Sequence, residues 1–271
     1  MEREPQHFIQ SLARGLNILQ AFSNQRPKLT LTDLAELTGM NKTAVQRYTD
    51  TLVGLGFLGR NRHKEFFLGP RVLNLGFAYL QGSPLRQLAA TYLSEFVERS
   101  GLTTNLAILD GTEVVFLYRK ETHRFLKFDL QAGSRLPSHC TSSGKVLLAS
   151  LEDADLRARI GRMRLERMTS HTITDPEVLF EEILRTRQRG YGIADKELTL
   201  ALCSIAVPVL DMEGRVVAAM NVGISSEDAH GEVLEHTIRQ VVDQGRQLST
   251  VSGYQGEYPV IPARGFAGDD P

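Results

Sequence analysis

Polar side chains that can hydrogen-bond to nucleic acid recur along residues 42–49. They are Lys42, Thr43, Gln46, Arg47 and Thr49. Glutamine and arginine can form paired hydrogen bonds with adenine and guanine edges in the major groove, whereas lysine and threonine suit phosphate oxygens. No acidic side chain interrupts the run before Asp50. On the outer face of a helix, these residues would form a surface that contacts DNA.

The element expected to position them is a pair of short helices over residues 29–58, joined by a tight turn. Thr30 can cap the first helix, and Asp33 stands three residues later, as in a capping box. Gly39 can end that helix in a left-handed conformation, and Asn41 can cap the second. The pattern indicates a helix-turn-helix. The alternative is an ordinary solvated helical hairpin, because many helix pairs end in glycine.

A basic β-hairpin, or wing, is predicted after the second helix. The runs 57–58 and 65–68 favour strands, and the turn between them carries Arg60, Arg62 and Lys64. These side chains would contact phosphates and make DNA affinity depend on salt. The residues expected to contact DNA are Lys28, Thr30, Asn41, Lys42, Thr43, Gln46, Arg47, Arg60, Arg62 and Lys64.

A third amphipathic helix is predicted over residues 9–22 and would complete a winged helix-turn-helix domain. Ile9, Leu12, Leu16 and Leu19 fall on one side of this helix. That apolar side is expected to pack on the other two helices.

Composition limits the class of protein. A chain of 271 residues with 42% hydrophobic and 23% charged residues can bury two cores. The net charge of -1 argues against a globally basic nucleic-acid coat, but residues 1–80 carry an excess of basic side chains. No apolar run is long enough to span a bilayer, no secretion signal is evident, and Cys140 and Cys203 give no disulfide framework. A cytoplasmic protein is expected.

Four segments are predicted along the chain. They are a winged helix-turn-helix domain at 1–69, a linker helix at 70–83, an effector-binding domain at 84–250 and a mobile tail at 251–271. The linker carries more apolar residues than a lone helix can hide, which favours pairing between subunits. Docking onto the body of the same subunit is the alternative. The tail is expected to be mobile because it carries Gly, Pro and Asp without periodicity.

The second domain is predicted to be an α+β body with a mostly antiparallel sheet. Hairpin signals at 110–113 and 211–214 each separate two β-prone runs, and a further strand is expected at 124–130. Helices are expected near 142–151, 153–162, 176–189 and 228–249.

By these features the chain resembles the IclR family of bacterial transcriptional regulators over nearly its whole length. The resemblance is carried by the helix-turn-helix, FFLGPRVLNLGFAYL at 66–80, GSRLPSHCTSSGKVLLA at 133–149, RQRGYGIADKEL at 187–198 and SIAVPVLDMEGRVVAAMNV at 204–222. Within the family, it is most similar to regulators of protocatechuate and 4-hydroxybenzoate breakdown. The resemblance implies a GAF-like effector domain, a dimer or dimer of dimers, and control of a catabolic operon.

The resemblance also implies an effector site between the sheet and the helix that begins at the small-residue turn 141–144. Exposed N–H groups at a helix start favour an anion. Many family members carry cysteine at the position of Ser204; here the cysteine is Cys203, which strand alternation would point to the other face. The expected effector-binding residues are Arg119, Arg135, His139, Thr141, Ser142, Ser143, Gly144, Asp195, Glu197, Ser204, Met220, Asn221 and Gly223.

Arg119 and Arg135 are the candidates for pairing a ligand carboxylate, because a guanidinium can bind a carboxylate through two hydrogen bonds. Ordinary ion pairs within the protein are the alternative for both residues. His139 and Cys140 lie together, but a zinc site would need further ligands at defined spacing, so no metal is expected. The alternatives for His139 are a hydrogen bond to the effector and, favoured over it, a hydrogen-bonded histidine in the core. No cofactor is expected either, since the chain lacks a P-loop and a dinucleotide fingerprint.

Two hypotheses of function remain. The first is a ligand-responsive transcription factor, which binds double-stranded operator DNA as a dimer and senses a small, aromatic carboxylic acid. The second is a small-molecule sensor that acts through protein contacts, with a weak DNA-binding domain. An enzyme is not expected: Ser142, His139 and Asp195 could suggest a triad, but no G-x-S-x-G nucleophile elbow is present.

Overall fold

The computed structural model describes residues 7–122 and 130–266 of the chain. The chain divides into two compact units, Met1–Gly82 and Ser83–Pro271. The strand predicted at 124–130 lies outside the described residues except for Leu130, which belongs to no strand.

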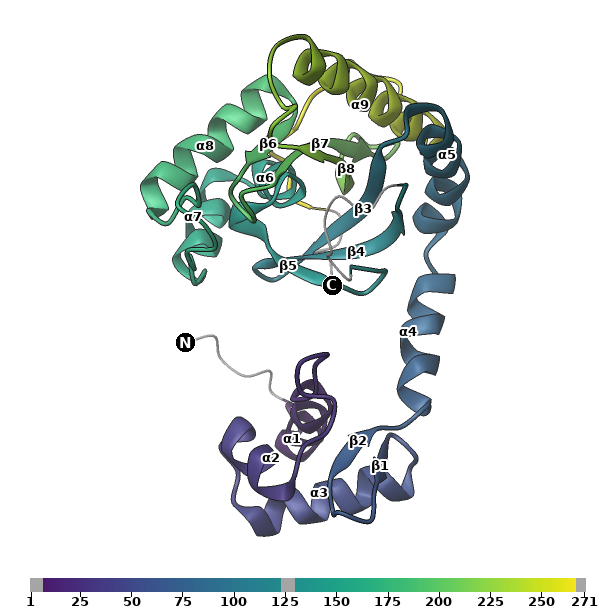
Figure 1. The fold of residues 1–271 in the computed structure, drawn as a ribbon, viewed down its shortest axis with the longest axis vertical. Helices are drawn as coiled ribbons and strands as arrows, with labels where there is room; N and C mark the ends of the chain where they lie inside the picture. The colour runs from purple at the N-terminus through teal and green to yellow at the C-terminus, as the bar shows by residue number, and fades with distance from the viewer. Residues whose placement is uncertain (1–6, 123–129, 267–271) are drawn as a thin grey trace. The chain divides into compact units, whose positions relative to one another are not determined.

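The first unit is a winged helix-turn-helix domain followed by a further helix, as predicted (Figure 1). Its elements are α1 (Gln10–Gln20), α2 (Leu31–Thr38), α3 (Lys42–Gly54), β1 (Leu58–Arg60), β2 (Phe66–Leu68) and α4 (Arg71–Gln81). β1 and β2 pair antiparallel and form the predicted wing.

The caps of the helix-turn-helix are those expected from the sequence. The Thr30 hydroxyl accepts a hydrogen bond from the Asp33 N–H, and the Asp33 carboxylate accepts one from the Thr30 N–H at 2.8 Å. Gly39 ends α2 in the left-handed conformation, with φ of 67°. The Asn41 side chain accepts from the N–H of Ala44 at 2.8 Å and begins α3. Local hydrogen bonds thus fix both ends of the turn.

Packing within this unit corrects two expectations. Leu12 and Leu16 are 60% and 48% exposed, whereas Ile18 is fully buried with Leu34 and Val45. Thr49, expected to face outward, is also fully buried. The hydroxyl of Thr49 can be buried because it donates a hydrogen bond to the main-chain oxygen of Val45 in the same helix, at 3.0 Å.

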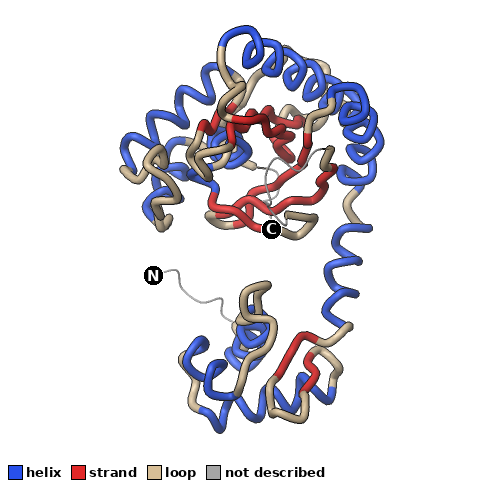
Figure 2. Tube along the Cα trace, in the orientation of Figure 1, coloured by secondary structure: helices blue, strands red, loops and turns tan. Residues whose placement is uncertain are grey.

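The second unit is an α+β body (Figure 2). Its elements are α5 (Pro84–Ser100), β3 (Thr103–Asp110), β4 (Glu113–Lys120), β5 (Arg135–Pro137), the short 3-10 helix η1 (Ser138–Cys140), α6 (Ser142–Ala149), α7 (Asp153–Gly161), α8 (Pro176–Arg189), β6 (Gly192–Asp195), β7 (Leu202–Leu210), β8 (Val216–Ser225) and α9 (Gly231–Val251). Among the described residues, the strands form one six-stranded antiparallel sheet in the order β5-β4-β3-β8-β7-β6.

The sheet carries helices on both faces. On one face, α6 approaches so closely that a side chain at Gly192 of β6 would collide with the main-chain oxygen of Ser142. On the other face, Gly245 of α9 stands against Val207 of β7, and α5 packs beside α9. Glycine is required at these points because neighbouring main-chain or side-chain atoms occupy the space that a Cβ atom would take.

Residues 252–266, predicted to belong to a mobile tail, include side chains that pack on the second unit. Tyr258, Ile261 and Phe266 are 7%, 5% and 5% exposed. The Tyr258 hydroxyl donates to the main-chain oxygen of Pro208 at 2.7 Å. Single apolar side chains can fill gaps on the surface of a folded body without forming a periodic pattern, so sequence periodicity gives no sign of them. Residues 267–271 lie outside the described part of the chain.

Candidate ligand cavity and DNA-contact surface

A row of residues crosses the α6 face of the sheet from β4 to β6. Strand register places Arg119 beside Asn105, Asn105 beside Asn221, Asn221 beside Ala206 and Ala206 beside Gly192. Directly paired residues point to the same face of an antiparallel sheet. The row therefore brings a guanidinium and two amides onto the face that α6 covers, and it ends beneath the start of α6.

A β-bulge adds an aromatic side chain to the same face. The pairing of β3 with β4 shifts between Leu106 and Ala107, so that Ala107 pairs with Phe116. Without the shift, Phe116 and Arg119 would point to opposite faces, because side chains alternate along a strand. With it, both line one cavity.

The start of α6 supplies hydroxyl groups from above the sheet. Thr141 caps the helix, and its hydroxyl accepts a hydrogen bond from the N–H of Gly144 at 3.2 Å. Ser142 and Ser143 follow in the first turn, where N–H groups have no partner within a helix. Gly144 is required because a Cβ atom there would collide with the main chain of Ser138.

Between α6 and the sheet lies a cavity of about 80 Å³. One water molecule needs roughly 10–15 Å³ by this measure, so the cavity has room for a small organic molecule. Its lining residues are Thr103, Asn105, Phe116, Arg119, Glu121, Leu130, Leu136, Thr141, Ser142, Ser143, Leu198, Ala201, Leu202, Ser204, Asn221, Gly223, Ile224 and Ser225.

Several polar atoms of the lining are buried without a hydrogen-bond partner among the described residues. They are Nε of Arg119, Oγ of Ser142, Oγ of Ser143 and Oδ1 of Asn221. A buried polar group without a partner costs about 1–3 kcal/mol. Because four such atoms line one cavity, a polar ligand that bonds to them would recover part of that cost.

Arg119 already has two partners. Its Nη1 donates to Oδ1 of Asn105 at 2.9 Å, and its Nη2 forms an ion pair with Oε1 of Glu121 at 3.0 Å. Only 11% of the Arg119 side chain is exposed. The positive charge at this end of the cavity is therefore balanced by the carboxylate of Glu121.

Other predicted effector residues lie outside the cavity. Arg135 binds Asp110 and Glu113 at 2.7 Å each on an exposed edge of the sheet, so the ion-pair alternative holds for it. Met220 pairs with Val207 and points to the α9 face, because alternation places it opposite to Asn221.

His139 does not line the cavity but is a hydrogen-bonded histidine of the core, the alternative given for it above. It is buried, and its Nε2 donates to the main-chain oxygen of Glu166 at 3.1 Å. Burial lowers the pKa of His139 below its ordinary value of 6.5. Gly144 and Asp195 do not line the cavity: Gly144 is the contact between α6 and Ser138, and Asp195 is exposed at the end of β6, beside Cys203.

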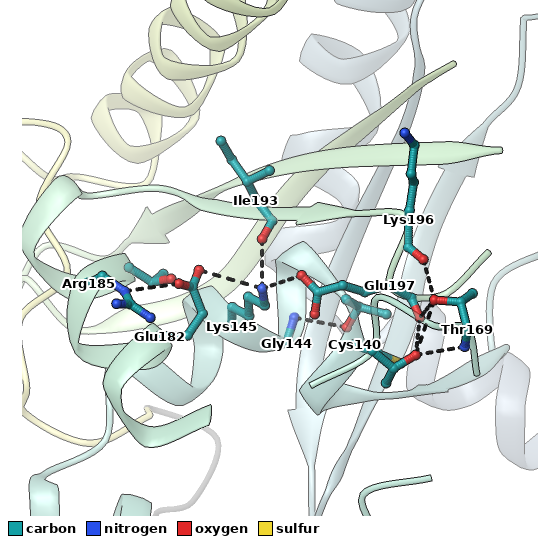
Figure 3. Close-up of polar contacts among 12 residues, drawn as sticks. Cys140, Gly144, Lys145, Thr169, Glu182, Arg185, Ile193, Lys196 and Glu197 are labelled. Atoms are coloured by element: carbon teal, nitrogen blue, oxygen red, sulfur yellow. Dashed lines mark hydrogen bonds and ion pairs between the residues drawn. The ribbon is translucent and has the colours of Figure 1, made fainter. Parts of the chain in front are cut away.

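Glu197 lies in a buried charge cluster next to the cavity (Figure 3). Its Oε1 is 2.5 Å from Nζ of Lys145 in α6, and Lys145 is also 3.5 Å from Glu182 and donates to the Ile193 oxygen at 2.9 Å. Burial raises the pKa of Glu197, although the neighbouring ammonium opposes this shift. Lys145 was not predicted as part of the site, although a lone lysine in an otherwise small and apolar helix could have indicated a buried partner.

Asn105 and Thr103 also line the cavity and were not predicted to do so. They stand two residues apart on β3 and share a face, but Thr104 between them is polar too, so the sequence shows no clear period of two. The cysteines do not line the cavity. Burial raises the pKa of the Cys140 and Cys203 thiols to about 12, so neither is a reactive thiolate at neutral pH.

The residues predicted to contact DNA lie on the surface of the first unit. Lys42, Thr43 and Arg47 are exposed on α3, and Lys28, Thr30 and Asn41 are exposed near the starts of α2 and α3. Gln46 is half-buried, and its Nε2 donates to Oδ1 of Asp50 at 2.6 Å, so binding to a base would compete with that bond.

The wing presents Arg60, Arg62 and Lys64, all exposed. Its turn is held by Asn61, whose Oδ1 accepts from the N–H groups of His63 and Glu65 at 2.9 and 3.0 Å. In the described residues, no group of three potential metal ligands is found, and no helix is long and apolar enough to cross a membrane.

Two family models match the chain. The model of the IclR helix-turn-helix domain matches residues 11–62, and that of the bacterial transcriptional regulator IclR C-terminal domain matches residues 77–250. The chain is 40% identical to the Pca regulon regulatory protein of Pseudomonas putida, over 79% of this chain and 74% of that protein. It is 37% identical to the p-hydroxybenzoate hydroxylase transcriptional activator of Acinetobacter baylyi, over 81% and 83%.

Solved structures resemble the chain over most of its length. An IclR homolog of Microbacterium hydrocarbonoxydans, crystallised with 4-hydroxybenzoate, is 29% identical with a TM-score of 0.73, over 89% of this chain and 98% of that one. An IclR family transcriptional regulator of Brucella abortus is 26% identical with a TM-score of 0.80, over 93% and 95%.

Proposed function

The chain belongs to the IclR family of DNA-binding bacterial transcriptional regulators, which are not enzymes, and we propose that a small aromatic carboxylic acid controls its binding to DNA upstream of a catabolic operon. The protein would act in the cytoplasm, where the operator DNA is accessible. The observation that carries the proposal is the cavity beneath α6, with its unpartnered polar atoms.

The carboxylate of the effector is placed at the start of α6. Within residues 7–122 and 130–266, the hydroxyls of Ser142 and Ser143 have no partner, and the N–H groups of a first helical turn attract an anion. The side chains of Phe116, Leu136 and Leu202 offer apolar surface to a ring. The similarity to the p-hydroxybenzoate hydroxylase transcriptional activator, and to the homolog crystallised with 4-hydroxybenzoate, supports an aromatic acid.

DNA would be contacted by α3 and the wing. Arg47 on α3 can bond to a guanine edge, whereas Arg60, Arg62 and Lys64 on the wing can contact phosphates. Removing a base contact should weaken binding to the operator selectively, while removing a phosphate contact should weaken binding to all DNA sequences alike.

Self-association would use the exposed apolar residues of α4. Leu73 and Phe77, one helical turn apart, are 72% and 66% exposed, and Leu75 and Tyr79 are 59% and 58% exposed. Soluble proteins rarely leave such a patch in contact with water. A dimer paired through α4 would present two α3 helices to a near-palindromic operator. Replacing Leu73 and Phe77 by Glu should lower the mass measured by sedimentation equilibrium.

Operator binding with and without acid tests the proposal. Fluorescence anisotropy with DNA from the region upstream of the protein's own gene should show binding that weakens steeply with salt. Adding 4-hydroxybenzoate should change that affinity by about 5- to 150-fold, equivalent to about 1–3 kcal/mol of coupling. Absence of DNA binding at low salt would refute the regulatory role, and a DNA affinity unmoved by any aromatic acid would refute the proposed effector class.

Two variants sharpen the test. Arg47→Ala should weaken operator binding more than binding to unrelated DNA, with Arg62→Ala as the matched phosphate-contact control. Ser142→Ala should reduce the response to acid and leave DNA binding without acid unchanged, because Ser142 lies in the second unit.

A further inference from the structure

We propose that Arg119 and Glu121 together bind a hydroxyl group at the end of the effector remote from its carboxylate, and so select hydroxy-substituted acids over unsubstituted acids and dicarboxylic acids. The inference rests on the proposed function, since it assumes a carboxylate at the start of α6. It assigns to Arg119 a role different from pairing that carboxylate, and it makes Glu121 a residue that determines specificity.

Charge balance in the cavity is the first argument. Among the described lining residues, Arg119 is the only cation and Glu121 the only anion, and they form an ion pair at 3.0 Å. A ligand carboxylate at this end would stand next to the Glu121 carboxylate without an uncompensated positive charge to offset the repulsion. The cavity therefore accommodates one anionic group. The start of α6 can attract that group, because no other carboxylate among the described lining residues offsets the attraction.

The positions of the two polar ends are the second argument. Arg119 lies on β4, while the start of α6 lies over Gly192 on β6, four strand spacings away along the row. Neighbouring strands are about 4.8 Å apart, so the two ends of the row are separated by roughly 19 Å between main chains. Long side chains shorten that span, but one small group cannot bond to both ends. A ligand that bonds to both ends therefore carries a second polar group.

Hydrogen-bond complementarity is the third argument. Among the residues that the structure describes, Nε of Arg119 is a buried donor without a partner, and Oδ1 of Asn221 is a buried acceptor without one. Glu121 adds carboxylate oxygens, which accept only. A hydroxyl can accept from Nε and donate to a carboxylate or an amide oxygen, whereas a carboxylate cannot donate and a hydrogen atom can do neither. Of these substituents, only a hydroxyl meets both demands.

Binding of three related acids tests the inference. Isothermal titration calorimetry would measure the affinity of the full-length protein for 4-hydroxybenzoate, benzoate and terephthalate. We expect 4-hydroxybenzoate to bind roughly tenfold or more tightly than benzoate, because benzoate leaves the buried partners unsatisfied. Terephthalate, with a second carboxylate in place of the hydroxyl, should bind more weakly than benzoate.

A charge-removing variant identifies the residue responsible. Glu121→Gln retains a side-chain oxygen that can accept from Arg119 but removes the negative charge. It should reduce the preference for 4-hydroxybenzoate over benzoate several-fold, and should increase affinity for terephthalate. Glu113→Gln is the matched control, because Glu113 is paired with an arginine outside the cavity. It should leave all three affinities unchanged.

The outcomes separate this inference from the proposed function. If the wild-type protein binds benzoate and 4-hydroxybenzoate equally, or prefers terephthalate, the inference is wrong while an acid-responsive regulator remains. Unchanged ligand preferences in Glu121→Gln would remove Glu121 from the site. If the wild-type protein binds none of the three acids, both the inference and the proposed effector class fail.

Discussion

The side-chain nitrogen of Lys145 lies 2.5 Å from a carboxylate oxygen of Glu197, and both residues are almost fully buried. Lys145 belongs to α6, and Glu197 begins the segment that contributes Leu198 and Ala201 to the cavity lining. The Thr172 hydroxyl donates to the main-chain oxygen of Glu197 at 2.7 Å and fixes the same segment. The pair thus holds the start of a helix and a wall of the cavity in one arrangement.

Removing one member of this pair should be strongly destabilising. Lys145→Met leaves the Glu197 carboxylate buried without its counter-ion, which should cost about 3–5 kcal/mol of unfolding free energy. The double variant Lys145→Met, Glu197→Gln should recover part of that loss, because it buries no uncompensated charge. Urea denaturation measures both. Arg239→Met is the control: Arg239 pairs with Glu235 on the surface and should change stability by less than about 1 kcal/mol. A Lys145→Met loss as small as the control's would contradict the prediction.

Gly144→Ala should disturb the start of α6. The added Cβ would collide with the main chain of Ser138, which cannot move as a side chain can. We expect a loss of about 1–3 kcal/mol or more in thermal unfolding, together with weaker binding of aromatic acids. At Gly161, also helical, a Cβ would meet nothing within 4 Å. Gly161→Ala should therefore be neutral or stabilise by about 0.4–1 kcal/mol. Similar losses in the two variants would argue against the tight contact.

Stability should fall on mild acidification because of His139. Burial lowers the folded-state pKa of this imidazole below 6.5, whereas in the unfolded chain it takes up a proton near that value. Between these two pKa values the unfolded state binds more protons, so stability is complete above pH 6.5 and is lost as the pH falls through it. The midpoint of urea unfolding should shift less with pH in His139→Gln. His171→Gln, at an exposed position, should retain the wild-type dependence.

The contact of Tyr258 with β7 should contribute measurably to stability. Tyr258→Phe removes the hydroxyl that donates to the Pro208 oxygen, which should cost about 0.5–1.5 kcal/mol. Tyr254 provides the matched control, since its hydroxyl donates to the Glu257 oxygen on the surface at 2.9 Å. Tyr254→Phe should change the melting temperature little. Ending the chain after Val251 should destabilise the second unit more than either substitution; an unchanged melting temperature would mean that the packed tail is not needed.

Local features of the fold were predictable because they depend on residues three or four positions apart. The capping oxygens of Thr30 and Asn41 and the left-handed Gly39 all belong to this class. The inner face of α1 was not predictable in this way. Its buried residue is Ile18, which the pattern of leucines does not indicate, because packing against two other helices sets the rotation of α1.

The candidate cavity was predictable only in part. The small-residue turn before α6 is visible in the sequence, and Ser142 and Ser143 do line the cavity. Arg119 and Arg135 cannot be distinguished without strand register, which pairs Arg119 with Asn105 and Arg135 with Val115. From that position the Arg135 side chain binds Asp110 and Glu113. The bulge that turns Phe116 toward the cavity depends on the pairing of β3 with β4, and has no signal in a single strand.

The pairing of β3 with β8 has a consequence for synthesis of the chain. Asn105 and Asn221 meet across it, although β8 is the last strand to leave the ribosome. N-terminal domains fold first during synthesis, so the DNA-contacting unit can form while β3 still lacks one neighbour. A nascent chain therefore lacks the β8 side of the cavity until β8 emerges. Under the proposed function, a chain cut short of β8 would carry a complete DNA-contacting domain without the proposed control by an acid.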